Sequence, residues 1–381
     1  MYWFRFRIWQ AKVTLLALLF CSCSKQDDAL PPKAPRTLLV YLGCDNNLSS
    51  EAALKLAALA KGAKGCNGNL LVYQDAAGEN GTPKLWRITS TGEAAGTVTL
   101  EKEYAEHSSA SSQVFGQVVL DVLQQYPASS YGLLVFSHGS GWLPKGALAN
   151  PKSIIIDGME EMEIEDFANA LPDRTFDYIV FEACFMASVE VAYQLRKKAK
   201  HIVASAAEIL SPGFVRMYEA NLPMLFEEKP NLRGFAEAYY NHYNNMQGGY
   251  RSATVSVVCT DSLERLAQSV RQCRAFSDSA VTYGTIQHFD RISSTSNRHI
   301  FYDLEDVIKK GADSLTYRTF KKVLDKCVLY KKSTPVFMQG SYGGFAISTH
   351  CGLTAYIENK NFSVLNEYYR KTSWRRAVNG E

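Results

Sequence analysis

Two apolar segments, each followed by a residue suited to catalysis, constrain the fold of this chain most strongly. Residues 133–136 and 178–181 are continuous apolar runs, which predict strands buried in a parallel sheet. His138 and Gly139 follow the first run, and Cys184 follows the second. Because ligands bind at the carboxyl ends of the strands in an open parallel sheet, both side chains are expected at one crevice. A base beside a thiol is the minimum arrangement for a cysteine nucleophile, so the sequence predicts a cysteine hydrolase.

Strands and helices alternate through the first half of the chain, and this alternation predicts the fold class. Further strands are expected at residues 38–41, 70–73, 85–88, 154–156 and 201–204, and helices at 51–61, 111–125, 163–171 and 187–198. The pattern predicts a three-layer α/β/α sandwich with a mostly parallel sheet. In the second half, helices are expected at 232–246, 261–276, 303–310 and 315–327, and strands at 253–259 and 344–348. This half is expected to complete the sheet and to add a helical C-terminal extension.

The composition suits a sizeable enzyme and argues against several other classes of protein. The chain has 381 residues, 46% hydrophobic and 21% charged, so it can bury a full core. A net charge of +3 and the lack of a basic stripe argue against nucleic-acid binding. The nine cysteines are scattered, without a C-x-x-C pair or zinc-ligand spacing, so neither a disulfide framework nor a zinc site is expected. No G-x-S-x-G motif occurs, which argues against a serine esterase. The protein is expected to be a monomer.

The first 36 residues resemble an export signal followed by a tether. A basic segment and the short apolar run 13–20 precede Cys23, after which the chain turns polar. Residues 1–23 resemble a bacterial lipoprotein signal with Cys23 as the lipid-bearing residue, and 24–36 are expected to form a flexible tether. This predicts a lipid-anchored protein of the bacterial cell envelope, on the periplasmic or the outer-membrane face. An ordinary cleaved signal and a short uncleaved anchor are the alternatives.

Each residue at the two strand ends has a role that its chemistry allows. Cys184 would attack a carbonyl carbon as the thiolate, favoured by the amino terminus of a helix expected to begin near Met186. His138 would protonate the leaving amine and then activate water. The Gly139 N–H can approach a developing oxyanion closely, and the Cys184 N–H is the natural second donor. Either residue alone is more often structural, but the two strand ends together favour catalysis.

The same residues resemble the signatures of the caspase-like clan of cysteine peptidases, and most closely those of the clostripain family. The similar segments are LLVYLGCDNNLSS at 38–50, FSHGSGW at 136–142 and FEACFMASVEVAYQL at 181–195, with a weaker continuation at 201–214. The resemblance implies a caspase-like catalytic core over 37–215, with 216–381 as a C-terminal region. It also implies a cysteine endopeptidase that acts on polypeptides with a His138–Cys184 dyad and no obligatory third member.

The resemblance further implies a preference for cleavage after arginine or lysine. Family members commonly carry an aspartate two positions before the nucleophile, in the pocket for the residue preceding the cut, and this chain has Glu182 there. Asp45, at another strand end, is a second candidate for substrate binding, although a helix-capping role is the simpler interpretation. Legumain-like enzymes carry Glu-Ala-Cys and prefer asparagine, and Ala206–Glu208 is less acidic than is usual in the family, so basic specificity is the favoured hypothesis among these.

Processing and cofactors are also suggested by the family resemblance. Some members are activated by a cut between the histidine and cysteine strands, where this chain offers Lys145 and Lys152 as self-cleavage candidates. Calcium dependence is known in the family, but no D-x-D-x-D-G loop is present, so no cofactor and no metal site are predicted from the local sequence.

Two other functions remain open at this stage. The chain could be a catalytically idle surface-binding protein that keeps the fold, an interpretation favoured only by its altered specificity pocket. It could also be a cysteine amidase acting on small amides, which would need a deeper pocket than a peptidase cleft.

Overall fold

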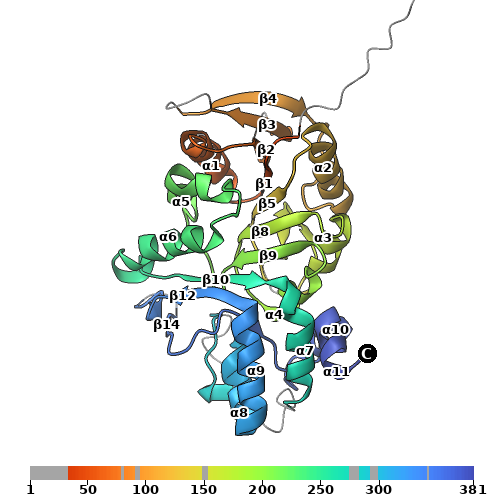
Figure 1. The fold of residues 1–381 in the computed structure, drawn as a ribbon, viewed down its shortest axis with the longest axis vertical. Helices are drawn as coiled ribbons and strands as arrows, with labels where there is room; N and C mark the ends of the chain where they lie inside the picture. Colours follow the sequence, from red (N-terminus) through yellow and green to blue (C-terminus); the bar gives the residue numbers. More distant parts are fainter. Residues whose placement is uncertain are drawn as a thin grey trace, which may run out of the picture. The chain divides into compact units, whose positions relative to one another are not determined.

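A nine-stranded sheet forms the centre of the protein, as the computed structural model shows (Figure 1). The structure describes residues 33–78, 81–90, 95–147, 153–273, 283–291, 299–340 and 343–381. The strands of this sheet are β1 (Thr37–Cys44), β2 (Asn69–Ala76), β3 (Lys84–Thr89), β4 (Thr97–Glu103), β5 (Tyr131–Phe136), β8 (Phe176–Glu182), β9 (Ala199–Ala204), β10 (Thr254–Cys259) and β12 (Val328–Ser333).

The strand order brings the two catalytic candidates to the same edge of the sheet. The order is β12-β10-β9-β8-β5-β1-β2-β3-β4. The five strands from β9 to β2 run parallel to one another, whereas β3, β4, β10 and β12 pair antiparallel at the two sides. Strands β5 and β8 are direct neighbours, with Phe136 opposite Glu182. The residues that follow these two strands therefore emerge side by side.

Alternating apolar side chains on the central strands build two cores, one on each face of the sheet. On β1, Leu39 and Tyr41 belong to one core, and Leu38, Val40 and Leu42 belong to the other. All five side chains are almost completely buried, as expected for a strand covered on both faces.

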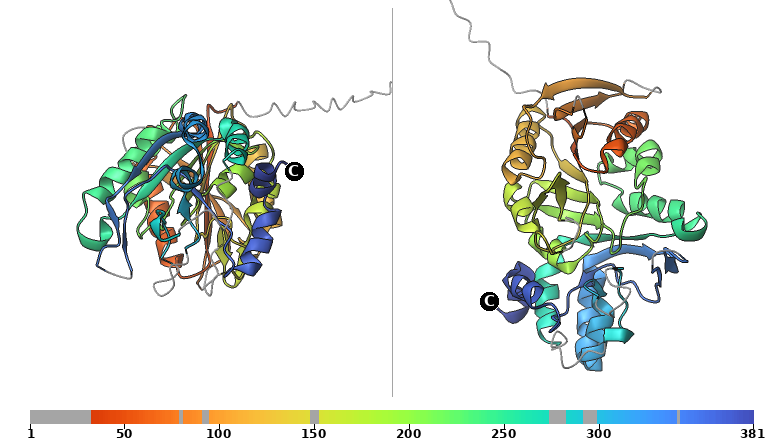
Figure 2. Two further views of the ribbon diagram at one scale, coloured as in Figure 1. Left: turned by 90° about the horizontal axis from the view of Figure 1, so that it is seen from below. Right: turned by 180° about the vertical axis from the view of Figure 1, so that it is seen from behind.

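Helices cover both faces of the sheet. The described helices are α1 (Ser49–Gly62), α2 (Ser112–Gln125), α3 (Ile164–Ala170), α4 (Val189–Gln194), α5 (Val215–Asn221), α6 (Leu232–Asn244), α7 (Leu263–Arg271), α8 (Leu304–Gly311), α9 (Ser314–Cys327), α10 (Ser363–Lys371) and α11 (Ser373–Asn379). Helices α1, α5 and α6 bury residues in one core, and the other helices contribute to the second (Figure 1). Seen from below, α6 lies on one side of the sheet and α10 on the other (Figure 2). The predicted α/β/α sandwich is therefore confirmed.

Some expected elements differ from the observed ones. The expected strand at 154–156 becomes β6 (Ile155–Asp157), which pairs only with β7 (Glu160–Met162) outside the main sheet. The expected late strand becomes β14 (Phe345–Ala346), paired with β13 (Val336–Phe337). Two further strands, β11 (Tyr302–Asp303) and β15 (Thr354–Ala355), pair with each other. Short 3-10 helices occur at Leu222–Leu225, Gly248–Tyr250, Thr260–Ser262 and Tyr283–Thr285.

The C-terminal half is part of the same compact unit as the first half. Residues Lys33–Glu381 form one unit, to which β10 and β12 contribute sheet strands. The seven cysteines from Cys44 to Cys351 in the described residues are all free thiols. Within the described ranges, no helix has both the length and the apolar character needed to cross a membrane. Residues 1–32, which include Cys23, lie outside the part of the chain that the structure describes.

Candidate active site

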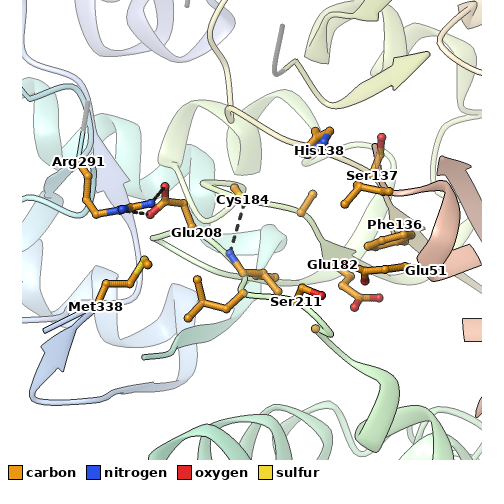
Figure 3. A pocket seen from close by; sticks show the side chains of 15 residues that line it. Glu51, Phe136, Ser137, His138, Glu182, Cys184, Glu208, Ser211, Arg291 and Met338 are labelled. Carbon is orange, nitrogen blue, oxygen red and sulfur yellow. Dashed lines mark hydrogen bonds and ion pairs between the residues drawn. The ribbon is translucent and has the colours of Figure 1, made fainter. Parts of the chain in front are cut away.

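A pocket of about 260 Å³ opens at the carboxyl ends of the parallel strands (Figure 3). His138 follows β5 and Cys184 follows β8, and both line this pocket, as the strand-end pattern predicts. Both side chains are half-buried, so each is reachable from solvent. The other lining residues come from the ends of β5 and β8, from the start of α1, from the segment after β9 and from the C-terminal half: Leu48, Glu51, Phe136, Ser137, Glu182, Ala183, Glu208, Ile209, Leu210, Ser211, Gly213, Arg291 and Met338.

The imidazole of His138 is held by an amide from the loop after β1. Its Nε2 lies 2.6 Å from the Oδ1 atom of Asn47. An amide oxygen can only accept a hydrogen bond, so this contact assigns a proton to Nε2. In the neutral imidazole, Nδ1 then carries the lone pair and is the basic nitrogen. Asn47 therefore selects the tautomer of the histidine.

Gly139 lies directly against the backbone of Cys184. A Cβ atom added at residue 139 would lie 2.7 Å from the carbonyl oxygen of Cys184 and 3.1 Å from its nitrogen. The first distance is shorter than real Cβ contacts allow, so this approach of the two strand ends requires glycine. The Gly139 N–H forms no hydrogen bond with another described residue, and is thus available to an incoming ligand.

The helix after Cys184 begins later than the sequence predicts. Helix α4 starts at Val189 rather than near Met186, with the hydroxyl of Ser188 accepting a hydrogen bond from the Val191 N–H. The N–H groups of Phe185 and Ala187 instead donate to backbone carbonyls of the segment after β9, and Phe185 has a φ of 61°. These contacts delay the first helical turn. The expected helix terminus beside the sulfur is therefore wrong. One hydrogen bond to Cys184 Sγ comes instead from the Ile209 N–H, at 3.4 Å.

Glu182 lines the pocket, but its carboxylate is bound from inside the protein. The Nζ atom of Lys55 lies 2.6 Å from Glu182 Oε1, and both side chains are completely buried. The Phe214 N–H donates to the same oxygen at 2.5 Å, and the Tyr218 hydroxyl donates to Oε2. Burial raises the pKa of Glu182, whereas the Lys55 ammonium and these hydrogen bonds oppose the shift. The charge of Glu182 is therefore already balanced before a substrate binds.

The pocket as a whole still carries a negative charge. Glu208 pairs with Arg291 through two hydrogen bonds of 2.8 and 2.6 Å. The carboxylate of Glu51 lies 3.4 Å from Lys55 Nζ, which is farther than the 2.6 Å between Lys55 Nζ and Glu182. The Glu51 side chain is 14% exposed. Among the described residues in and below the pocket, three carboxylates (Glu51, Glu182 and Glu208) are therefore paired with two cations, Lys55 and Arg291. Glu51 is the carboxylate with the least compensation.

Other predicted site residues lie outside this pocket. Asp45 does not line it and lies instead beside Asp75 and Asp157. Lys145 is exposed, in a short segment after the histidine loop, and its N–H donates to Glu163. Lys152 and Cys23 lie outside the described residues.

Several pocket residues were missed by sequence reasoning. Asn47 belongs to a polar cluster at a strand end, which offered a signal because such ends line ligand crevices. Lys55 falls on the buried face of α1 with Ala52 and Leu59, and a lysine in an apolar stripe indicates a buried partner. Tyr218 and Arg291 carry no local signal, since only packing brings them to the site.

Comparisons with known proteins found one protein family and several solved structures that are similar to this chain. A model of the clostripain family matches residues 40–379. An inactive zymogen C11 protease from Parabacteroides distasonis is 33% identical, with a TM-score of 0.79 over 91% of this chain and 99% of that one. A secreted C11 cysteine protease from Bacteroides thetaiotaomicron, solved with an irreversible peptide inhibitor, is 29% identical, with a TM-score of 0.78 over 91% and 99% of the two chains. A search of curated proteins gave no match.

Proposed function

The chain belongs to the clostripain family and is a cysteine peptidase, and on that premise we propose that His138 and Cys184 form its catalytic dyad. The observation that carries this proposal is the meeting of the two strand ends at one pocket, with Gly139 packed against the Cys184 backbone. The peptide-inhibitor complex of the relative from Bacteroides thetaiotaomicron supports a peptide as the substrate.

The proposed reaction has two stages. In the first, the Cys184 thiolate attacks the scissile carbonyl carbon, and the N–H groups of Gly139 and Cys184 stabilise the oxyanion. The C–N bond then breaks as the His138 imidazolium gives its proton to the leaving amine, which leaves a thioester on Cys184. In the second stage, His138 takes a proton from water, the resulting hydroxide attacks the thioester, and the acid product leaves the thiolate behind.

Asn47 supports this cycle by holding the histidine. Its Oδ1 accepts from Nε2, so Nδ1 is the nitrogen that exchanges protons with the sulfur, the amine and water. The hydrogen bond also becomes charge-assisted when His138 is protonated, which stabilises the imidazolium. We therefore assign Asn47 as a positioning residue.

The dyad is tested by peptide hydrolysis with the freshly reduced protein beside Cys184→Ala and His138→Ala variants. We expect cleavage by the wild type and none by either variant. A rate for Cys184→Ala equal to that of the wild type would exclude the proposed nucleophile. Inactivity of a folded, reduced wild type on a full peptide library would instead support the idle binding protein.

We propose cleavage after arginine or lysine, with Glu51 as the carboxylate that receives the basic side chain. The surplus negative charge of the pocket supports this, because the carboxylate of Glu182 is balanced by Lys55. The position of Glu51 on the pocket lining supports a contact with a long cationic side chain.

A positional peptide library, read for the wild type and a Glu51→Gln variant, tests this specificity. We expect kcat/KM for arginine substrates to fall about tenfold, or ~1.4 kcal/mol, while uncharged substrates change little. Glu237→Gln, a change at an exposed position of α6, is the matched control. Wild-type cleavage after asparagine would keep the mechanism and overturn the basic preference.

We also propose self-cleavage after Lys145 or Lys152. The exposure of Lys145 supports access by a peptidase, and its position between the two catalytic strands matches the processing loop that the family resemblance implies. Purified wild-type protein should show the cut, and Cys184→Ala should not. The same cut in purified Cys184→Ala protein would show that another peptidase makes it.

We propose that Cys23 anchors the mature protein to the bacterial envelope. The lipoprotein-like segment before Cys23 supports the proposal. Expression of the full chain should place it in the membrane fraction, and Cys23→Ala should move it to the soluble fraction. An unchanged distribution would favour an uncleaved anchor.

A further inference from the structure

Two histidines and an aspartate of the C-terminal half meet next to the candidate active site. One ligand atom of each of His288, Asp290 and His299 lies within 4.8 Å of the ligand atoms of the other two. The residue after Asp290 is Arg291, whose guanidinium pairs with Glu208 in the pocket (Figure 3). The proposed catalytic cycle uses none of the three clustered side chains, so their meeting requires a separate explanation.

Backbone pairing brings the three residues together. His288 forms an antiparallel bridge with Tyr302, so the chain folds back and returns His299 to the segment that holds His288 and Asp290. Nine residues separate Asp290 from His299 in the sequence. This separation is longer than the ligand spacings of common zinc motifs, which is why the sequence pattern did not indicate a site here.

The two imidazole rings are stacked face to face. Their centroids are 3.3 Å apart, and their planes differ by 8°. Two imidazolium rings at this separation would repel each other, so the stack favours neutral rings, the form that binds metals. His288 Nδ1 lies 3.1 Å from the carbonyl oxygen of Asp290, which can only accept, so Nε2 of this ring carries the lone pair. A hydrogen bond of this kind commonly orients a metal-binding histidine.

The distance between His299 and Asp290 fits two ligands of one metal ion better than a strong hydrogen bond. His299 Nδ1 lies 3.3 Å from Asp290 Oδ2. A charge-assisted N–H···O bond measures about 2.7–2.9 Å. By contrast, two atoms that each lie about 2.0–2.1 Å from a tetrahedral zinc ion are about 3.3–3.4 Å apart. The Asp290 side chain is completely buried, and its Oδ1 accepts from the N–H groups of Ile300 and Phe301, which leaves Oδ2 for a metal.

From this arrangement we propose that His288, Asp290 and His299 bind a divalent transition metal of the zinc type. Two imidazoles and a carboxylate are a known set of zinc ligands, with water in the fourth position. The nitrogen ligands separate this site from a calcium site, because calcium takes oxygen ligands. Both histidines are half-buried, so a metal ion can reach the cluster from solvent.

A bound metal would hold the chain on both sides of a residue that lines the pocket. Asp290 directly precedes Arg291, and His299 follows it. Arg291 is the cation that pairs with Glu208, at 2.6 Å. The metal would therefore help to fix the position of this charge in the pocket. It would act on position alone, because its three ligands are not among the described residues that line the pocket.

Calorimetric titration of an untagged, metal-free Cys184→Ala protein with ZnCl₂ tests the site directly. This background is needed because the thiol of the proposed dyad can itself bind zinc. We expect about one zinc ion per chain with a dissociation constant below about 10⁻⁵ M, and a higher Tm in zinc than in chelator. His288→Gln and His299→Gln, each made in this background, should weaken binding at least about tenfold. Excess CaCl₂ should not compete with zinc.

His242→Gln is the matched control, because His242 is a half-buried histidine of α6 outside the cluster. It should bind zinc as the background protein does. In chelator, the variants at His288 and His299 should keep a Tm close to that of the background, which separates loss of a ligand from damage to the fold.

The absorption spectrum of the cobalt(II) complex of the background protein is a second measurement that needs no further variant. Nitrogen and oxygen ligands should give d–d bands without a thiolate-to-cobalt charge-transfer band. A thiolate band would place the metal on a cysteine and overturn the proposal. Absence of saturable zinc binding would overturn it as well, and so would equal zinc affinities of the background and both histidine variants.

Discussion

Replacing Lys55 by methionine should destabilise the protein strongly, because it removes the cation that balances a buried carboxylate. Lys55 and Glu182 are both completely buried, and 2.6 Å separates their charged atoms. Removing one partner of a buried ion pair typically costs ~3–5 kcal/mol. Glu182 would keep its hydrogen bonds from Phe214 and Tyr218, so we expect the lower end, about 3 kcal/mol.

A double-mutant cycle isolates the pair from simple loss of packing. Glu182→Gln alone leaves the Lys55 ammonium buried near Glu51, 3.4 Å away, and should cost less than Lys55→Met. The double variant Lys55→Met with Glu182→Gln contains no unpaired charge at the pair and should lie within ~1–2 kcal/mol of the wild type. Lys61→Met is the matched control on the same helix. Lys61 lies 3.3 Å from Glu219, and the Lys61 side chain is 62% exposed. We therefore expect Lys61→Met to lower the free energy of unfolding by only ~0–1 kcal/mol.

The measurement is urea unfolding at pH 7, repeated at pH 5 and pH 8. Without Lys55, burial raises the pKa of Glu182 in the folded state above its unfolded value, so the folded protein binds more protons. Stability then falls as pH rises through this range, and the penalty of Lys55→Met should be smaller at pH 5 than at pH 8. A cost below about 1 kcal/mol, or strictly additive effects in the double variant, would refute the reasoning.

Three further changes test other parts of the structure. Gly139→Ala should lower kcat at least about 100-fold, because the added Cβ would lie 2.7 Å from the Cys184 carbonyl oxygen. Gly249→Ala, whose added Cβ would meet open space, is the control and should be as active as the wild type. Equal rates for the two variants would contradict the packing of Gly139 against Cys184. Asn47→Ala should lower kcat roughly 10- to 100-fold with little change in KM. Asn47→Asp keeps the hydrogen-bond acceptor and should recover most of this loss. A change in KM alone would argue against a positioning role for Asn47. Burial raises the pKa of Glu190 to about 7, so the contribution of Glu190 to stability should be lost as pH rises from about 4 past 7. Glu190→Gln should therefore make Tm depend less on pH over this range. An unchanged slope of Tm against pH would exclude Glu190 as the cause of the dependence.

The buried ion pair with Lys55 changes the interpretation of Glu182, which lies two positions before the proposed nucleophile Cys184. The family resemblance predicts that the carboxylate of Glu182 binds a basic side chain of the substrate. The structure directs that carboxylate inward to Lys55, on a helix 127 residues earlier in the chain. Gly213 has a φ of 61°, and an added Cβ would lie 2.0 Å from Glu182 Oε1, so the glycine makes room for the inward position. The proposed preference for arginine or lysine therefore depends on the net charge of the pocket rather than on Glu182 alone.

The sequence alone determined the fold class and the pair of catalytic candidates. Apolar runs that end at His138 and Cys184 specify buried parallel strands, and neighbouring parallel strands have their carboxyl ends at one edge. Their meeting follows from local pattern and strand direction, without knowledge of side-chain packing. The start of the helix after Cys184 was not determined in this way, because contacts with the segment after β9 delay it.

Only the tertiary structure decided how the charged groups are paired. Asn47 meets His138 across 91 residues, and Arg291 meets Glu208 across 83. Asp45, Asp75 and Asp157 form no local motif, and yet their carboxylates converge. The physical reason is that hydrophobic periodicity encodes the direction and burial of an element, whereas the partner of a buried charge depends on which other element packs against it. The sequence around Glu182 therefore carries no sign that its carboxylate is buried against Lys55.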